Sequence, residues 1–300
     1  MNFNKITLRN NIQICYDILG KDLNTEPIIL ISGAGLQMLG WPDEFCKLLA
    51  DRNNKIIRFD NRDMGESTNL TYLPSPSPLW FTLKQKFGFN IKPPYTLENL
   101  AEDVVQLMDA LGIEKAHLVG ISLGSMIAQI VAYTYNDRVA SLVCIATQAR
   151  NSAHSMPKIS TVLKIMKSPK PGKQGYIDWS INLVKAVGGS MAHDSNEYIG
   201  EIAGKMFDRG INNKGMNRQV CAVYASNDRR KFLSGISVPT LIIHGAEDPL
   251  IDSEAGEEVA KSIPGSEFRI IEKMGHGILK PAWSQLVDLI DNHIKSSSQK

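Results

Sequence analysis

The chain has 300 residues, of which 43% are hydrophobic, and its 33 basic and 31 acidic side chains give a formal net charge of +2. This length suits two domains or one large α/β unit, and the apolar content is sufficient for a large core. Because the overall charge has no marked sign, it favours neither a nucleic acid nor an anionic membrane as a partner.

The N-terminal residues alternate polar and apolar side chains and contain no apolar stretch long enough for a signal peptide or a membrane span. We therefore expect a cytoplasmic protein. Four cysteines, at positions 15, 46, 144 and 221, lie far apart in apolar runs and show no Cys-x-x-Cys spacing. That distribution is typical of reduced core residues rather than of a disulfide or metal framework.

Apolar runs in the first seventy residues predict two buried strands. Residues 27–31 form a continuous apolar run, as expected for a central parallel strand covered on both faces, and the small residues 32–35 follow it. A second such run, 55–59, ends in the polar segment 60–67. The other elements expected here are an alternating hairpin at 5–9 and 13–19, joined by Asn10-Asn11, and a helix at 42–52.

Residues 70–95 are rich in proline and aromatic side chains and have the character of an insertion before the next helix. One interpretation is a solvated, proline-rich loop. The other is that Trp80, Phe81, Phe87 and Phe89 cover the entrance of a pocket or a partner surface. The composition of the segment leaves both interpretations open.

Helix and strand signals alternate again from residue 96 to residue 146. Thr96 is suited to cap a helix whose apolar residues recur at helical spacing up to Leu111, and Gly112 ends it. Residues 116–119 read as a short buried strand, residues 125–132 as a helix, and residues 139–146 as another strand. Strand, helix, strand and helix in this order favour a parallel sheet with helices on both faces.

The pentapeptide Gly120-Ile121-Ser122-Leu123-Gly124 lies between the 116–119 strand and its helix, and it matches the Gly-x-Ser-x-Gly turn that presents a nucleophilic serine. Such a turn is strained, so the residues two positions from the serine must be small. The backbone N–H of Leu123 would point into the same space, where a developing oxyanion is stabilised. The alternative is a glycine-rich turn with an ordinary serine.

The chain resembles the α/β-hydrolase superfamily in this turn together with Ser32-Gly33-Ala34-Gly35, residues 39–45 and residues 60–67. Within that superfamily, residues 40–43 are most similar to bacterial esterases of the aclacinomycin methylesterase type. The resemblance implies a mostly parallel sheet of about eight strands with helices on both faces. It also implies that the Ala34 backbone N–H is the second oxyanion donor, although residues 32–35 can also be read as a tight turn only. Many relatives begin this loop with His-Gly, so Ser32 implies a different support.

The two remaining catalytic positions come from the same resemblance. Asp248, just after the strand at 239–245, is where the superfamily keeps the acid that orients the histidine, with Glu247 as the adjacent competitor and a plain turn carboxylate as the alternative. His276 follows the last strand, 268–271, and its flanking glycines are expected to free the backbone to aim it. The chain order Ser122, Asp248, His276 is the order that this fold requires. A helix over 278–294 is expected to close the domain.

Residues 148–235 differ from the flanking parts because helix-like segments rich in methionine and aromatic residues are broken at 171–172 and 188–189. The resemblance implies a helical cap here, between core parts at 1–147 and 236–300. Methionine-rich surfaces adapt to irregular apolar ligands, but most of these side chains are expected in a core. His154 and His193 are expected to be ordinary histidines. The methionines of this region are Met156, Met166, Met191, Met206 and Met216.

These residue types predict a serine hydrolase. His276 would take the proton of Ser122 during attack on a carbonyl and return it to the leaving alcohol, while Asp248 fixes the imidazole tautomer. This chemistry requires no metal and no organic cofactor. We expect a small, apolar, uncharged ester as substrate and no nucleic acid partner; a homodimer is possible. The alternatives are perhydrolase or cofactor-free haloperoxidase activity, carbon–carbon bond hydrolysis, and a non-catalytic binding protein. Ser122 counts against the dehalogenase and epoxide-hydrolase branches.

Overall fold

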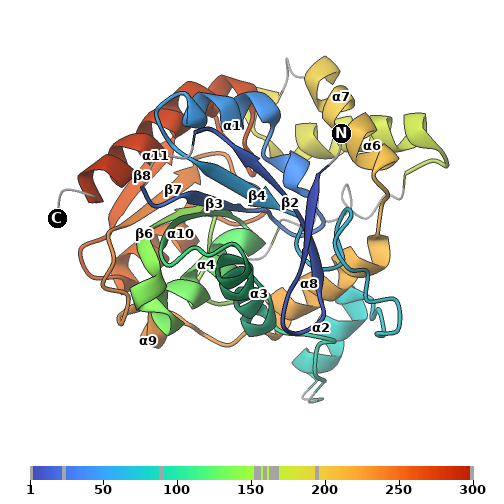
Figure 1. The fold of residues 1–300 in the computed structure, drawn as a ribbon. Helices are drawn as coiled ribbons and strands as arrows, with labels where there is room; N and C mark the ends of the chain where they lie inside the picture. Colours follow the sequence, from blue (N-terminus) through green and yellow to red (C-terminus); the bar gives the residue numbers. More distant parts are fainter. Residues whose placement is uncertain are drawn as a thin grey trace.

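The computed structural model describes residues 3–21, 25–87, 89, 91–151, 157, 161, 169–192 and 196–297. Within these residues one sheet of eight strands has the order β1-β2-β4-β3-β5-β6-β7-β8, and helices cover both of its faces (Figure 1). Strand β2 alone runs opposite to the others: its pairings with β1 and β4 are antiparallel, and all other pairings are parallel. The expected fold class is therefore confirmed. The strands are β1 (Asn4–Thr7), β2 (Gln13–Leu19), β3 (Ile28–Ile31), β4 (Ile56–Phe59), β5 (Ala116–Ile121), β6 (Val139–Ile145), β7 (Thr240–Gly245) and β8 (Glu267–Ile271).

The central strands are buried on both faces, which explains their continuous apolar runs. Every residue of β3, β4 and β5 is buried, and Ile28 lies opposite Ile56 of β4 and His117 of β5 in the parallel register. One core fills the space under α3 (Leu97–Ala110), α4 (Leu123–Thr134) and α10 (Ser253–Ser262). A second core lies under α1 (Asp43–Ala50) and α11 (Trp283–Ser297) on the opposite face.

Local signals set the ends of several elements. Thr96 caps α3 by a reciprocal pair of hydrogen bonds with Asn99, as its hydroxyl accepts from the Asn99 N–H while the Asn99 side chain accepts from the Thr96 N–H. Asn11 turns the β1–β2 hairpin with φ 62°, a left-handed value that asparagine tolerates. The short 3-10 turns described are Met38–Gly40, Asn136–Arg138, Ser190–Ala192 and Lys280–Ala282.

The segment at 70–95, expected to be a loop or a covering surface, contains a helix, α2 (Pro78–Lys86). Phe81 is buried, whereas its neighbour Trp80 is 62% exposed. The two side chains therefore do not share one exposed surface, and the interpretation that the aromatic residues of this segment cover a pocket entrance stays a prediction. Phe81 instead lies on the side of α2 that holds the helix to the body of the protein.

In the described residues between β6 and β7, the helices are α6 (Lys173–Val187), α7 (Asn196–Asp208), α8 (Asn213–Ala225) and the single turn α9 (Arg230–Leu233). We call α6, α7 and α8 the inserted helices. Of the methionines expected in this region, Met206 is buried and Met191 packs against a core cluster. Met156, Met166, His154 and His193 lie outside the described residues.

All four cysteines are free and buried, which agrees with the expectation that they are reduced core residues. Burial raises the pKa of the Cys46 and Cys144 thiols to about 12, so these thiols stay protonated at neutral pH. Within the part of the chain that the structure describes, no helix has the length and apolar character needed to cross a membrane.

Candidate active site

Ser122 occupies the sharp turn between β5 and α4. Its backbone adopts φ 54° and ψ −118°, a strained conformation for a residue with a side chain. A Cβ atom at Gly124 would lie 2.0 Å from the Ile31 carbonyl oxygen, and one at Gly120 would lie 2.4 Å from the carbonyl group of Gly124. Both flanking positions therefore exclude any side chain, as expected for a turn that presents its central residue.

Backbone and side-chain hydrogen bonds hold this turn in place. The Ser122 N–H donates to the Ile145 carbonyl at 2.9 Å. The Ser125 hydroxyl oxygen lies 2.6 Å from the Gly120 carbonyl oxygen and 2.9 Å from the Ile145 carbonyl oxygen, so its single proton can be donated to either. Ser122 itself remains partly exposed, although its neighbours Ile121 and Leu123 are buried. The hydroxyl of Ser122 can therefore meet a ligand.

Asp248 and His276 are in direct contact. The ring Nδ1 of His276 lies 2.7 Å from Asp248 Oδ2, and the side chain of Asp248 is fully buried. Asp248 Oδ1 accepts hydrogen bonds from the N–H groups of Leu250 at 2.8 Å and Ile251 at 3.0 Å. Burial alone would raise the pKa of this carboxyl, but the charge of His276 and hydrogen bonds from His244 and His276 outweigh it and hold the pKa well below its usual range.

An ionised Asp248 sets the chemistry of His276. A carboxylate can only accept at Nδ1, so that nitrogen carries the proton and Nε2 is left as the basic nitrogen. Glu247, the competing acid, instead accepts hydrogen bonds from Ser190, from its N–H at 2.6 Å and from its hydroxyl at 2.8 Å. In the described residues no hydrogen bond joins the Ser122 hydroxyl to His276; such contacts often tighten only when substrate is bound.

A second histidine touches the same carboxylate. His244, the last residue but one of β7, is fully buried, and its Nε2 lies 3.4 Å from Asp248 Oδ2 and 3.0 Å from the Ile251 carbonyl oxygen. Gly256 of α10 lies so close that a Cβ there would approach His244 Nδ1 to 2.3 Å. His244 was not among the residues predicted from the sequence; its place directly before Gly245, at the end of the strand that leads to Asp248, was the available signal.

The loop that carries His276 is attached to the end of α6. The Gly275 N–H donates to the Gly188 carbonyl at 3.0 Å, and the His276 N–H donates to the Val187 carbonyl at 2.6 Å. A Cβ at Gly275 would lie 2.2 Å from the Val187 carbonyl oxygen, whereas one at Gly277 would meet nothing within 4 Å. Of the two glycines that flank His276, only Gly275 is thus required by close packing. The Gly188-Gly189 break is a docking site for this loop.

The two expected oxyanion donors belong to backbone segments next to Ser122. Leu123 begins α4, and a Cβ at Gly33, next to Ala34, would lie 3.5 Å from the Ser122 Cβ. Among the described residues neither the Ala34 N–H nor the Leu123 N–H has a hydrogen-bond acceptor. Both N–H groups are therefore free to donate to a ligand, and the N-terminus of α4 adds positive potential there.

The loop after β3, which begins with Ser32, is held by side chains from other segments. The Asn61 side chain donates to the Ser32 carbonyl at 3.2 Å. From α8, the Gln219 side chain accepts from the Gly35 N–H at 2.9 Å and donates to the Arg62 carbonyl at 3.1 Å. The inserted helix α8 thus binds both the loop after β3 and the loop after β4.

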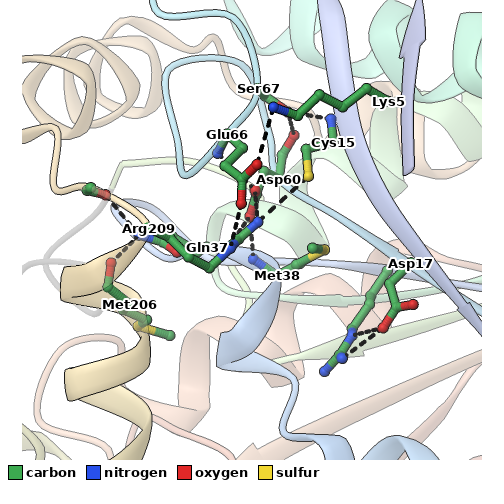
Figure 2. Close-up of polar contacts among 12 residues, drawn as sticks. Lys5, Cys15, Asp17, Gln37, Met38, Asp60, Glu66, Ser67, Met206 and Arg209 are labelled. Atoms are coloured by element: carbon green, nitrogen blue, oxygen red, sulfur yellow. Dashed lines mark hydrogen bonds and ion pairs between the residues drawn. The ribbon is translucent and has the colours of Figure 1, made fainter. Parts of the chain in front are cut away.

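A buried ion pair next to this loop adds a second connection to the inserted helices (Figure 2). Asp60, fully buried after β4, accepts from the Met38 N–H at 2.7 Å and from Arg209 Nη2 at 2.6 Å. Arg209 follows α7 and also donates to Gln37 Oε1 at 2.7 Å, while Gln37 donates to the Met206 carbonyl at 2.9 Å. The polar segment after β4 therefore fixes the position of the end of α7.

Comparison with known proteins identifies the family. A family model described as the alpha/beta hydrolase fold matches residues 26–281. Rhodomycin D methylesterase DauP of Streptomyces sp. is 24% identical over 297 residues, covering 91% of this chain and 92% of the relative. The methylesterase DnrP of Streptomyces peucetius is 23% identical, with the same coverage.

A solved structure shows the same architecture over the whole length. The enol-lactonase of Burkholderia xenovorans superimposes with a TM-score of 0.70 at 20% identity, covering 99% of this chain and 100% of the other. The expected resemblance to the superfamily and to its methylesterases is confirmed, and the expectation of a hydrolase agrees with these relatives. The chain belongs to the alpha/beta hydrolase fold family.

Proposed function

We propose that this protein is a serine hydrolase that cleaves carboxylic esters through an acyl-enzyme, with Ser122, His276 and Asp248 as its catalytic residues. The observation that carries the proposal is the buried, ionised Asp248 in contact with His276 Nδ1, which leaves Nε2 as a base. The strained turn at Ser122 and the two N–H groups without acceptors support the other roles.

The reaction follows from these groups. Nε2 of His276 removes the proton of the Ser122 hydroxyl as its oxygen attacks the ester carbonyl. The N–H groups of Ala34 and Leu123 stabilise the oxyanion. In other enzymes, deleting one such donor costs about 3 kcal/mol of transition-state stabilisation. The imidazolium then protonates the leaving alcohol, and the C–O bond of the ester breaks. Water, deprotonated by the same nitrogen, attacks the acyl-enzyme and releases the acid and free Ser122.

The substrate that we propose is a small, largely apolar ester without charge, with the inserted helices acting as a cap. Two relatives are named rhodomycin D methylesterases, which makes a methyl ester of a polycyclic acid one candidate. Apolar and sulfur-containing side chains on the inserted helices suit such ligands. These helices also carry residues that contact the loops around Ser122 and His276, which supports a role next to the site.

The test combines labelling with turnover. A fluorophosphonate should add one covalent adduct that maps to Ser122 by peptide mass spectrometry, and methyl and acyl esters of increasing size should be hydrolysed. Ser122→Ala should lose the label and all turnover above background, while Ser234→Ala, an exposed serine far along the chain, should keep both. Labelling of a different serine, or ester turnover that survives in Ser122→Ala, would contradict the proposal.

A further inference from the structure

Helix α2 presents an apolar stripe to solvent. Leu79, Trp80, Leu83 and Phe87 are between 36% and 73% exposed, and their spacing places them on one side of the helix. The Phe87 N–H donates to the Leu83 carbonyl at 3.1 Å, so Phe87 continues the last helical turn. Phe81 is buried on the opposite side of α2. The exposed stripe is thus the outer side of a docked helix.

Further contacts extend and fix this surface. The Phe89 N–H donates to the Lys84 carbonyl at 3.0 Å, which folds the chain back beside the helix and leaves the Phe89 side chain 63% exposed. Just before α2, Ser75 donates to the Lys214 carbonyl at 3.1 Å, and α2 packs against α8 at the periphery of the molecule (Figure 1). We call the exposed side chains of Leu79, Trp80, Leu83, Phe87 and Phe89 the α2 face.

The segment that carries the α2 face has charged residues of one sign only, unlike the whole chain. Between Glu66 and Glu98 the sequence contains three lysines, at positions 84, 86 and 92, and no acidic residue or arginine. Lys84 and Lys92 are exposed, and neither forms an ion pair with any residue that the structure describes. An exposed aromatic and aliphatic surface of this kind, with two unpaired lysines in the same segment, is complementary to a layer of apolar chains beneath anionic headgroups.

We propose that the α2 face binds the surface of an anionic lipid bilayer, with its tryptophan, phenylalanine and leucine side chains inserted at the headgroup boundary and its lysines among the phosphates. Tryptophan is suited to that boundary because its ring is apolar while its N–H can bond to water or headgroups. A second copy of the chain fits less well, because a symmetric dimer through this face would bring the lysines of both copies together. The protein would lie on the bilayer without crossing it.

Vesicle sedimentation of the 300-residue chain tests the proposal independently of any enzymatic activity. We expect the partition coefficient on vesicles of equal parts phosphatidylcholine and phosphatidylglycerol to exceed that on phosphatidylcholine alone by about tenfold or more, and to fall at high salt. Trp80→Ser combined with Phe87→Ser should reduce binding by about tenfold or more, since two interfacial aromatics are lost. Lys84→Gln with Lys92→Gln should reduce the preference for anionic vesicles.

Two further variants make the result specific. Phe232→Ser with Lys231→Gln removes an exposed aromatic residue and its neighbouring lysine from α9, and should bind vesicles like the original chain. Trp80→Phe should keep vesicle binding but lose the blue shift of tryptophan emission. Equal binding to neutral and anionic vesicles, no binding, or unchanged binding by the folded α2 variants would overturn the proposal. A dimer that the Trp80→Ser and Phe87→Ser changes dissociate, without vesicle binding, would assign the face to a second copy.

Discussion

Gln219 of α8 accepts a hydrogen bond from the backbone N–H of Gly35 at 2.9 Å and is itself completely buried. Gly35 follows Ala34, whose N–H is a proposed oxyanion donor, so an inserted helix sets the position of a catalytic loop. Small displacements of such donors weaken catalysis steeply, because their stabilisation depends on the geometry in the transition state. Gln219 is therefore a positioning residue for the proposed reaction.

We predict that Gln219→Leu lowers kcat for methyl esters by about tenfold while KM changes little, since the loop is loosened without loss of a substrate contact. The rate of fluorophosphonate labelling should fall in parallel. Gln174→Leu, which removes an exposed glutamine of α6 that binds Asp178, is the matched control and should behave as the original chain. A Gln219→Leu protein with unchanged kcat and only a lower Tm would show a purely structural role.

The contrast between Asp248 and Glu247 gives a second prediction. Asp248→Asn should lower kcat by about 10⁴-fold, because an amide that donates to Nδ1 imposes the wrong tautomer on the histidine. Glu247→Gln should keep turnover near normal, because Glu247 accepts hydrogen bonds from Ser190, whereas the ring of His276 contacts Asp248. Steady-state kinetics of the two variants, with circular dichroism to verify folding, decides between them. The opposite ranking would move the acid's role to Glu247.

The glycines on either side of His276 differ in what they tolerate. Gly275→Ala should lower both Tm and turnover, because its Cβ would collide with the Val187 carbonyl at 2.2 Å and separate the loop from α6. Gly277→Ala should be folded and active, since nothing lies within 4 Å of its Cβ. Thermal unfolding and ester turnover of both variants are the measurements. Equal losses in both would mean that backbone freedom, and not packing, is what His276 needs.

Features that depend on a few adjacent residues could be predicted from the sequence. Ile28–Ile31 is a strand because four consecutive apolar residues suit only a position covered on both faces. Positions 120 and 124 must be glycine because a Cβ there would collide with backbone atoms of the same turn or of β3. In both cases the signal lies within a stretch of a few residues, or in a motif whose geometry fixes its own surroundings.

Contacts between distant segments were not predictable in this way. In the sequence, Gln219 is an ordinary polar residue of a helix, and its role depends on the contact of α8 with Gly35. His244 is likewise one polar residue in an apolar strand, and its role depends on the contact with Asp248. The outward and inward sides of α2 differ between the adjacent Trp80 and Phe81, and the packing of α2 against the rest of the protein, α8 included, decides which side is buried. Such choices are made by packing and not by local preference.

His117 of β5 predicts a pH dependence of stability. Its side chain is buried, its Nδ1 lies 2.8 Å from the Ser141 hydroxyl, and desolvation lowers the pKa from 6.5 to about 4. Between these two values the unfolded chain binds more protons than the folded chain, so the free energy of unfolding falls as the pH falls from 6.5 towards 4.

The size of this pKa shift limits the loss in free energy of unfolding that His117 can cause to about 3 kcal/mol. Urea unfolding at a series of pH values should therefore give a shallower slope for His117→Gln than for the original chain over this window, whatever the variant's stability at neutral pH. Parallel slopes would show that other groups, and not His117, control stability in mild acid.

The Arg218–Asp63 pair supplies the last prediction, which concerns how α8 is held. Arg218 donates to both carboxylate oxygens of Asp63, at 2.6 Å and 2.8 Å, and the two side chains are 1% and 0% exposed. Removing one partner of such a pair leaves a buried charge without compensation, which typically costs about 3–5 kcal/mol. Arg218→Met should therefore lower the free energy of unfolding by about this amount.

A double-mutant cycle with Asp63→Asn separates this effect from lost packing. Asparagine tolerates the left-handed backbone of this position, φ 70°, so Asp63→Asn removes the charge while keeping the turn. If the cost of Arg218→Met arises from the stranded carboxylate, the double variant should recover much of the stability that Arg218→Met loses. Arg230→Met, which breaks the exposed pairs that Arg230 of α9 forms with Asp228 and Glu258, is the matched control and should leave stability unchanged. Strictly additive losses would instead mean that the arginine acts through its packing, and that the loop after β4 holds α8 by contact area and not by charge.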